Sequence, residues 1–360
     1  MFSLKDKKLA EEIISKIKSL DLELKFMHVC GTHQDTLVKF GLDSLLEQCG
    51  IKIGQGPGCP VCVTTTKEIE EMLLLTRKSK IVATFGDMVN VPGETQSLQS
   101  MKAEGYNVRT VYGIEDAVNL AETHRDKDIV FMAVGFETTA PTTASVLLND
   151  PPSNFSILCC HRTIPPALKS ILNMGEIKID GLIEPGHVST IIGTEPYEFI
   201  SKNYRVPQVI AGFEPLDLLM SVWMLVQQIE NGKAFVQNEY DRVVNTEGNV
   251  KAQKVIDEVF KPGDKKWRGF PVIPKSSLEL RSNFEKYDAR RKYESDLEEI
   301  SKKQFKEPEG CRCGELLRGL LLPQECPLFG TRCKPESPVG PCMVSVEGSC
   351  SIEYRYAKKR

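Results

Sequence analysis

The strongest constraint on the fold is a series of short apolar runs that end in glycine-rich loops along the first 220 residues. Helical patterns such as TKEIEEMLLLTRKSK lie between them. Strands that alternate with helices predict parallel α/β units. The runs pair at a sequence offset of about 100, which is too long for a single supersecondary repeat. We therefore predict two related α/β domains with about four parallel strands each.

The paired runs also suggest where the domains begin and end. The matching segments are 24–36 with 129–143, 51–62 with 155–166, 81–93 with 181–193, and 108–116 with 207–215. We expect an N-terminal amphipathic helix over 1–20, α/β domain I over 21–120, α/β domain II over 121–225, and a C-terminal domain over 226–360. The parallel sheets of the two α/β domains are expected to face a common cleft.

Charge and hydropathy argue against two classes of partner. The net charge is −3, so no global basic field indicates nucleic acid. No apolar run reaches the roughly 18–20 residues that a membrane-spanning helix needs. The first 20 residues do not resemble a signal peptide, because charges interrupt each apolar stretch. We therefore predict a cytoplasmic protein that binds neither nucleic acid nor membrane.

Twelve cysteines are unusual for a chain of this kind. In a reducing cytosol such a number indicates metal, cluster or redox chemistry rather than a disulfide framework. Cys49 at a predicted helix end, and Cys159 and Cys160 inside a predicted strand, are expected to be buried and unreactive. The other cysteines fall into an early group and a group of six in the last 50 residues.

Polar residues gather just after the predicted strands. In parallel α/β sheets, ligands bind at the carboxyl ends of the strands. Each candidate also has an ordinary structural role, since a lone histidine is usually a hydrogen-bonded loop residue and an acid before a helix is usually an N-cap. The sequence has no P-loop and no G-x-G-x-x-G, so nucleotide binding has little support. The candidates are Cys30, Thr32, His33, Cys59, Cys62, Asp87, Glu137, Thr138, Thr139, His161, Glu184, His187 and Glu214.

The C-x-x-C motif of Cys59 and Cys62 stands above the other candidates. It opens a helical pattern, and helix N-termini favour thiolate over thiol. Cys30 follows the preceding predicted strand, and His33 comes three residues later. Three thiols and an imidazole can bind a soft or borderline metal, zinc included. A redox pair and a buried thiol trio are the alternatives that this spacing leaves open.

The C-terminal segment carries the denser cysteine group. Four thiolates suffice for a [4Fe–4S] cluster, and two further thiols beside it could form a redox-active disulfide. A structural zinc held by four thiolates is the competing interpretation. The segment is therefore expected to form a helical, loop-rich iron–sulfur domain. Its six cysteines are Cys311, Cys313, Cys326, Cys333, Cys342 and Cys350.

With these motifs assembled, the chain resembles the HypD family of hydrogenase maturation factors over nearly its whole length. The motifs that carry the resemblance are CGTHQDT at 30–36, GPGCPVC at 56–62, TFGDMVNVPG at 84–93, GFETTAP at 135–141, EPGHVSTIIG at 184–193, GFEPLDLL at 212–219, and the C-terminal cysteine segment. The family commonly has a second histidine two residues after the first, where this chain has Asp35.

The resemblance implies a maturation scaffold with redox activity rather than a conventional turnover enzyme. Such proteins assemble the Fe(CN)2CO group of [NiFe]-hydrogenase together with the chaperone HypC, and receive cyanide from HypE. Carried onto this chain, Cys30 holds the iron with a cysteine of the chaperone, and His33 assists. Cys59 and Cys62 become the redox pair near that iron. The ligand-contacting residues expected around it are Thr32, Asp87, Glu137, His187 and Glu214.

The family also carries a [4Fe–4S] cluster, in an arrangement similar to that of ferredoxin–thioredoxin reductase. By this analogy, the expected ligands are Cys311, Cys326, Cys333 and Cys350. Cys313 and Cys342 are then the auxiliary thiols, although either member of the Cys311–Cys313 pair could ligate. Electrons would pass from the cluster through the auxiliary thiols to Cys59 and Cys62, or directly, and then to the iron.

Two other functions remain open from the residues. A stand-alone thiol/disulfide oxidoreductase would use Cys59 and Cys62 with cluster-fed electrons on a generic substrate. A zinc-stabilised α/β hydrolase or ligand-binding protein would use the thiols structurally. The absence of a G-x-S-x-G nucleophile elbow argues against hydrolysis.

Overall fold

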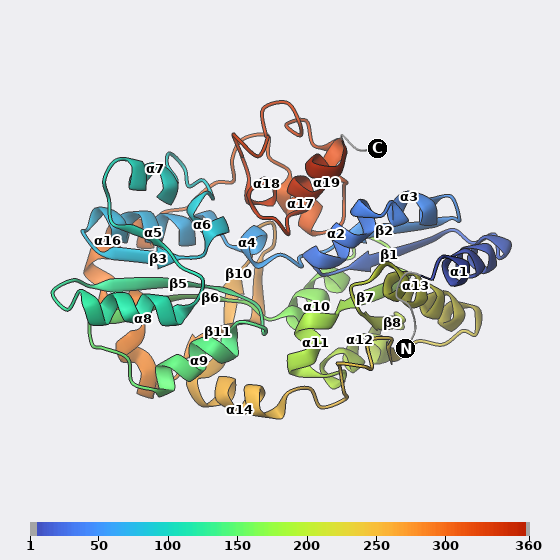
Figure 1. Ribbon diagram of the computed structural model, residues 1–360, viewed down its shortest axis with the longest axis horizontal. Helices are drawn as coiled ribbons and strands as arrows, with labels where there is room; N and C mark the ends of the chain where they lie inside the picture. Colours follow the sequence, from blue (N-terminus) through green and yellow to red (C-terminus); the bar gives the residue numbers. More distant parts are fainter. Residues whose placement is uncertain (1–5, 358–360) are drawn as a thin grey trace.

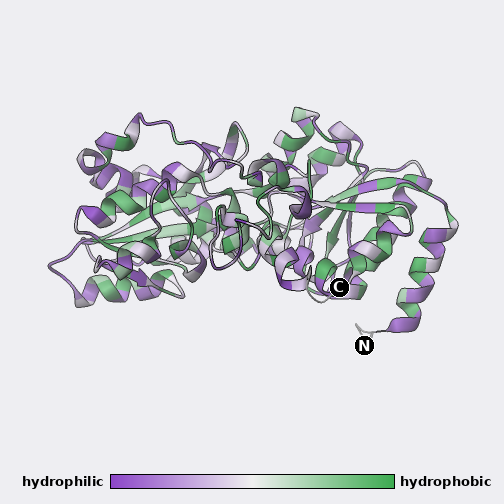
Figure 2. Ribbon diagram, turned by 90° about the horizontal axis from the view of Figure 1, so that it is seen from above, coloured by the Kyte–Doolittle hydropathy of each residue, from purple (hydrophilic) through white to green (hydrophobic). Residues whose placement is uncertain are grey.

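The computed structural model describes residues 6–357. It has two α/β lobes side by side, with the C-terminal segment lying across the top of them (Figure 1). Mostly hydrophobic strands run through the middle of each lobe, and helices cover them (Figure 2). Nothing in the described part of the chain forms a helix long and apolar enough to cross a membrane.

The first lobe is built on a five-stranded sheet, here called sheet A, with the order β2-β1-β7-β8-β9 and parallel pairing throughout. β1 is aligned with β2 so that His28 lies opposite Gln55, and both strands therefore end at the same edge. The strands of sheet A are β1 (Leu24–His28), β2 (Ile51–Gln55), β7 (Gly181–Pro185), β8 (Gln208–Ala211) and β9 (Val236–Asn238).

The second lobe is built on a four-stranded parallel sheet, here called sheet B, with the order β4-β3-β5-β6. Its inner strands are buried along nearly their whole length, as expected for a parallel sheet covered on both faces. The strands are β3 (Ile81–Thr84), β4 (Val108–Thr110), β5 (Ile129–Gly135) and β6 (Phe155–His161). A separate antiparallel pair is formed by β10 (Phe260–Lys266) and β11 (Val272–Leu280).

The predicted repeat reappears in the order of the strands. All eight predicted runs contain a strand, and β1, β2, β3 and β4 correspond to β5, β6, β7 and β8. Replacing each strand of β2-β1-β7-β8 by its counterpart gives β6-β5-β3-β4, which is the order of sheet B read in reverse. Each repeat therefore contributes two strands to each sheet.

The sheets consequently do not divide at residue 120, which differs from the expected boundary between domains I and II. The chain leaves sheet A after β2, builds the whole of sheet B, and returns to sheet A at β7. The expected start of the C-terminal domain at residue 226 also differs from the structure, because β9, which lies after that residue, is the last strand of sheet A. Apolar periodicity indicates which segments form strands, but pairing between distant strands depends on packing of the complete chain.

Helices connect the strands and cover the sheets. Those of the first half are α1 (Lys7–Ser19), α2 (Gly31–Lys39), α3 (Leu42–Glu47), α4 (Pro60–Val63), α5 (Thr66–Arg77), α6 (Gly86–Val89), α7 (Leu98–Ala103), α8 (Ile114–Thr123), α9 (Ala140–Leu148) and α10 (Ile164–Met174). The later ones are α11 (Gly186–Ile192), α12 (Glu198–Tyr204), α13 (Pro215–Glu230), α14 (Val250–Val259), α15 (Ala289–Lys292), α16 (Glu294–Ser301), α17 (Cys313–Leu317), α18 (Pro341–Val344) and α19 (Ser349–Ala357). Short 3-10 helices cover Glu195–Tyr197, Ser282–Tyr287 and Pro323–Glu325.

The N-terminal amphipathic helix is confirmed as α1, although the first five residues of the predicted span lie outside the described residues. Asp6 caps it by accepting a hydrogen bond from the Leu9 backbone N–H at 3.1 Å. Ile13 and Ile17 are buried, and the helix packs against α13.

The C-terminal segment is anchored over the edge at which β1 and β2 end. α19 packs against α2, while α17 and α18 both contact α4. The backbone of Gly31 is so close to this segment that a Cβ there would lie 2.5 Å from the Glu347 Cβ. The six C-terminal cysteines are thereby carried next to the early ones.

Candidate functional site

Cys30 lies where β1 ends and α2 begins, and it is the N-cap residue of α2. Its side chain is buried, and burial raises the pKa of the thiol to about 11. The backbone N–H groups of His33 and Thr32 favour the thiolate, but they do not outweigh burial. The Cys30 thiol is therefore protonated at neutral pH until something replaces the proton.

The GPGCPVC turn folds directly against Cys30. The Gly56 N–H donates to the His28 carbonyl at 2.8 Å, which continues the pairing of β1 with β2. A Cβ on Gly58 would lie 2.2 Å from the Cys30 nitrogen, so only glycine allows this backbone approach. The turn therefore fixes the C-x-x-C motif beside the iron-binding candidate.

Cys59 and Cys62 are joined by a disulfide bond, with their α-carbons 5.2 Å apart. Cys59 is the N-cap of the short helix α4, and its sulfur accepts a hydrogen bond from the Cys62 N–H at 3.2 Å. Both residues are 0% exposed. The disulfide is therefore shielded from solvent in the interior of the protein.

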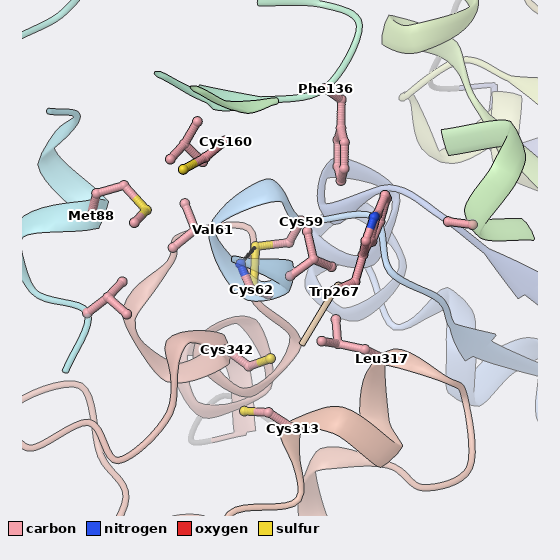
Figure 3. Close-up of a cluster of buried hydrophobic side chains, with 14 of the residues drawn as sticks. Cys59, Val61, Cys62, Met88, Phe136, Cys160, Trp267, Cys313, Leu317 and Cys342 are labelled. Carbon is pink, nitrogen blue, oxygen red and sulfur yellow. Dashed lines mark hydrogen bonds between the residues drawn. A yellow bond between two sulfur atoms is a disulfide. The ribbon is translucent and has the colours of Figure 1, made fainter. Parts of the chain in front are cut away.

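Cys313 and Cys342 lie on the side of the disulfide that faces the C-terminal segment (Figure 3). They come from the starts of α17 and α18, the two helices that contact α4. Both thiols are buried, and the Cys313 thiol interacts with those of Cys342 and Cys311. A series of sulfurs thus runs from the disulfide into the C-terminal segment.

The C-terminal thiols surround a small, mostly apolar cavity. Five of the six cysteines line it, whereas Cys342 does not. The Cys333 sulfur accepts a hydrogen bond from the Val339 N–H at 3.3 Å. Across residues 6–357, no three His, Cys, Asp or Glu side chains are grouped to hold a single metal ion. The cysteines that line the cavity are Cys311, Cys313, Cys326, Cys333 and Cys350.

Two histidines near Cys30 in the fold, His33 and His187, pack on the ring of Phe213. The His33 ring lies 5.2 Å from the Phe213 ring, and His187 stacks on the same ring at 3.8 Å. Burial lowers the pKa of His33 to about 3, and that of His187 is lowered for the same reason. His33 Nε2 lies 3.3 Å from the Ala211 carbonyl oxygen. Two neutral imidazoles, from the helices that follow β1 and β7, therefore pack on the aromatic ring that follows β8.

Two buried acids share this region. Burial raises the pKa of Glu137 to about 7 and that of Glu184 to about 8. Glu137 accepts a hydrogen bond from the Ile164 N–H at 2.9 Å, whereas neither carboxyl oxygen of Glu184 has a partner in the described part of the chain. Both acids and Cys30 raise the pKa of Tyr197 electrostatically, behind a larger effect of burial. Cys30 and acids from both lobes therefore lie within electrostatic range of Tyr197.

The other predicted site residues have structural contacts. Thr32 lies in the first turn of α2. Glu214 is the N-cap of α13, and its N–H donates to Asp217 at 3.1 Å. Asp87 is not an N-cap; it accepts hydrogen bonds from the Ser345 hydroxyl and the Val346 N–H, each at 3.0 Å. Asp87 thus ties the loop after β3 to the C-terminal segment.

Of the three cysteines predicted to be buried outside the site, Cys49 and Cys160 are buried, whereas Cys159 is half-buried and its thiol donates to the Leu278 carbonyl at 3.1 Å. Cys49 follows α3, and its thiol donates to the Leu45 carbonyl at 3.4 Å. Cys159 and Cys160 lie in β6, where burial raises the pKa of both thiols. His161, next in the strand, contacts the Thr143 hydroxyl at 3.0 Å and is a hydrogen-bonded structural residue.

Several site residues were not singled out from the sequence, although Phe213 lies within the GFEPLDLL motif at 212–219. Tyr197, Phe213 and Glu347 reach the site only through the tertiary fold. His28 is buried in β1, where its Nε2 lies 2.7 Å from the Gln34 side-chain oxygen. Glu347 lies within the C-terminal cysteine segment, so that motif was the one available pointer to it.

The fold and the site together define a two-lobed α/β protein with a buried thiol–disulfide centre. The model of the HypD family, described as the hydrogenase formation hypA family, matches residues 5–357. A putative hydrogenase expression/formation protein of Methanocaldococcus jannaschii is 47% identical, covering 99% of this chain and 100% of the relative. The hydrogenase maturation factor HypD of Escherichia coli is 41% identical, covering 93% and 90%. That of Rhizobium leguminosarum is 40% identical, covering 99% and 95%. The chain therefore belongs to the HypD family of hydrogenase maturation factors.

Proposed function

We propose that this protein is the scaffold on which the Fe(CN)2CO group of a [NiFe]-hydrogenase is assembled, in complex with a HypC-type chaperone and with cyanide from a HypE-type donor. The observation that carries the proposal is the convergence of Cys30, the Cys59–Cys62 disulfide and the C-terminal thiols in one buried region. Metal binding by thiolate and electron supply by a neighbouring disulfide centre are the two capacities that such assembly needs.

The iron is the substrate, and Cys30 holds it together with a cysteine of the chaperone. Because burial raises the pKa of the Cys30 thiol to about 11, iron has to displace a proton in order to bind. Binding is therefore coupled to release of a proton. Thr32 and His33, in the first turn of α2, orient the thiol as residues beside a metal ligand commonly do.

The two raised carboxyl pKa values suit recognition of the diatomic ligands. With pKa values of about 7 and about 8, Glu137 is about half protonated and Glu184 mostly protonated at neutral pH. A protonated carboxyl donates a hydrogen bond, and the nitrogen of iron-bound cyanide is an acceptor. His187 is positioned on Phe213 for the same purpose. Asp87 and Glu214 hold the surrounding loops in place.

The C-terminal cysteines fit a resident [4Fe–4S] cluster by their donor chemistry. A cluster takes four cysteine thiolates, and its ligands need not converge on one metal ion. Cys311, Cys326, Cys333 and Cys350 line the cavity and would hold it. Cys342 lies outside the lining, which supports its role as an auxiliary thiol. When bound, the cluster supplies electrons one at a time.

The auxiliary thiols pass reducing equivalents to the disulfide by exchange. The Cys342 thiolate attacks a sulfur of the Cys59–Cys62 bond, which breaks to give a mixed disulfide and one thiolate. The Cys313 thiolate then attacks Cys342 and releases the second thiolate. Overall, two electrons and two protons move from the Cys313–Cys342 pair to Cys59 and Cys62. The stand-alone oxidoreductase is less well supported, because a sealed disulfide excludes a bulky external substrate.

The test is anaerobic purification with and without the chaperone, followed by infrared spectroscopy in the cyanide and CO stretching region. Bands that appear only in the complex are expected. Cys30→Ala should remove both the bands and the substrate iron. Cys49→Ala removes another buried thiol and should retain them. A Cys30→Ala protein that still carried iron and the chaperone would show that the assignment is wrong.

A further inference from the structure

The loop Trp267-Arg268-Gly269-Phe270, called here the WRGF loop, lies between β10 and β11 and is bound to the disulfide turn. The Arg268 N–H donates to the Val63 carbonyl at 2.9 Å, and Arg268 Nε donates to the Thr64 carbonyl at 3.0 Å. Both acceptors follow Cys62 directly in the sequence. Figure 3 shows Trp267 beside the disulfide.

The same loop is bound to the helix that carries Cys313. The backbones of Gly269 and Gly314 touch so closely that a Cβ on Gly269 would lie 2.3 Å from the Gly314 Cα. Gly269 also has a φ of +79°, which favours glycine. The Arg318 guanidinium donates to the Gly269 carbonyl at 2.6 Å. The WRGF loop therefore contacts both the turn that follows Cys62 and the helix that carries Cys313.

Arg268 carries its charge into the interior. The residue is 1% exposed, and burying a cation costs free energy unless charges or hydrogen bonds compensate. On one side its Nη1 contacts Glu307 and the Thr66 hydroxyl, the latter at 3.3 Å. Its Nη2 has no hydrogen-bond partner among residues 6–357. The charge also interacts with the sulfurs of Cys313, Cys342 and Cys311.

We infer that Arg268 is a positioning residue for the reduction of the Cys59–Cys62 disulfide, stabilising the sulfur anions that form as the S–S bond breaks. The inference rests on the proposed function and assigns to it a residue that no cysteine motif contains. Reduction adds two electrons to the disulfide, taken from a dithiol, and the resulting thiolates then take up protons. A fixed positive charge favours this reduced form, so the disulfide becomes easier to reduce.

Three substitutions separate charge from packing. Arg268→Met removes the charge, and we expect the equilibrium constant for reduction of Cys59–Cys62 to fall about tenfold, which lowers the midpoint potential by about 30 mV. Arg268→Lys keeps the charge but loses the planar fork, so it should lower thermal stability while retaining the midpoint. Glu307→Gln removes the neutralising carboxylate and should shift the midpoint in the opposite direction to Arg268→Met.

The measurement uses the anaerobically purified full chain, equilibrated in mixtures of oxidised and reduced dithiothreitol. Differential alkylation and mass spectrometry of the peptide with Cys59 and Cys62 report its redox state. Equal midpoints in the wild type and Arg268→Met, or shifts of the same sign in Arg268→Met and Glu307→Gln, would overturn the role of Arg268. A failure of the proposed function gives a different result. In that case the Cys342→Ser variant reduces the Cys59–Cys62 disulfide at the wild-type rate, and this outcome does not depend on the midpoint measured for Arg268→Met.

Discussion

Gly58→Ala tests the contact that holds the disulfide turn against Cys30. A Cβ at this position would lie 2.2 Å from the Cys30 nitrogen and from the Val29 carbonyl carbon. Ordinary contact begins at about 3.4 Å, so the two backbones would have to separate by roughly 1.2 Å. Inserting a group into a packed interior costs about 1–3 kcal/mol, and here the obstacle is rigid backbone.

Gly54→Ala is the matched control, four residues earlier in β2. A Cβ on Gly54 would meet only the Phe26 carbonyl oxygen, at 3.8 Å. There alanine restricts the unfolded chain and gains about 0.4–1 kcal/mol. The two variants should therefore differ in the free energy of unfolding by roughly 1.5–4 kcal/mol.

Thermal unfolding under anaerobic conditions measures the difference, as an apparent melting temperature because a chain with two lobes need not unfold in one step. We expect Gly58→Ala to melt several degrees below Gly54→Ala, and to lose substrate iron when purified with the chaperone. If both variants melt together and both retain iron, the close packing of Gly58 on Cys30 does not position the site, and the reasoning fails.

Three further predictions follow from buried charge and from the cysteines. Arg162→Met removes one of the three cations around Glu68 and leaves Lys265 and Arg290, at 3.6 and 3.7 Å. The substitution should lower the free energy of unfolding, measured by denaturant titration, by about 3 kcal/mol. Burial disfavours ionised Glu68, but Arg162, Lys265 and Arg290 together outweigh burial and lower its pKa. The network's contribution should therefore be complete above the ordinary value of about 4.5 and decline progressively as pH falls below it toward the lowered folded-state pKa; an equal loss at pH 7 and pH 3 would contradict this. Burial raises the Glu184 pKa to about 8, so the native state retains a proton that the unfolded chain loses near pH 4.5, and the free energy of unfolding should decline between those values by as much as about 5 kcal/mol. Glu184→Gln should abolish that decline, and a melting-temperature difference from wild type that stayed constant between pH 5 and 8 would refute it. Cys326→Ala should lose the visible absorbance of the cluster, whereas Cys342→Ser should keep it but leave Cys59–Cys62 oxidised after chemical reduction of the cluster; loss of absorbance in both variants would reject the division between ligands and auxiliary thiols.

Most strands were predictable because each is a local pattern. Runs such as Ile129–Gly135 are apolar along their whole length, as expected for a parallel strand buried on both faces, and a glycine marks the end of this one. The strand β9 was not predicted, since Val236–Asn238 is short and only partly buried. The antiparallel pair β10–β11 was missed as well, because several of its residues are charged and exposed.

The candidate site was predictable where chemistry is concentrated in one residue type. Cysteines are rare enough for their spacing to carry information, and the position of Cys30 and the C-x-x-C motif after β1 and β2 follows from the strand pattern. The sequence left open whether Cys59 and Cys62 bind metal or form a disulfide; in the structure they form a disulfide. Arg268 could not be found this way, because one arginine among many gives no sign of being buried.

The sequence by itself determined the α/β class, the internal repeat, the separate cysteine groups and the resemblance to the HypD family. Only the tertiary structure decided that each repeat gives two strands to each sheet, that the helices carrying Cys313 and Cys342 contact α4, and that buried Arg268 binds the turn after Cys62. The physical reason is the range of the interactions. Apolar periodicity and turn residues act over a few neighbours, whereas the contact of Gly269 with Gly314 joins residues far apart in the chain. Such contacts exist only once the whole interior is packed.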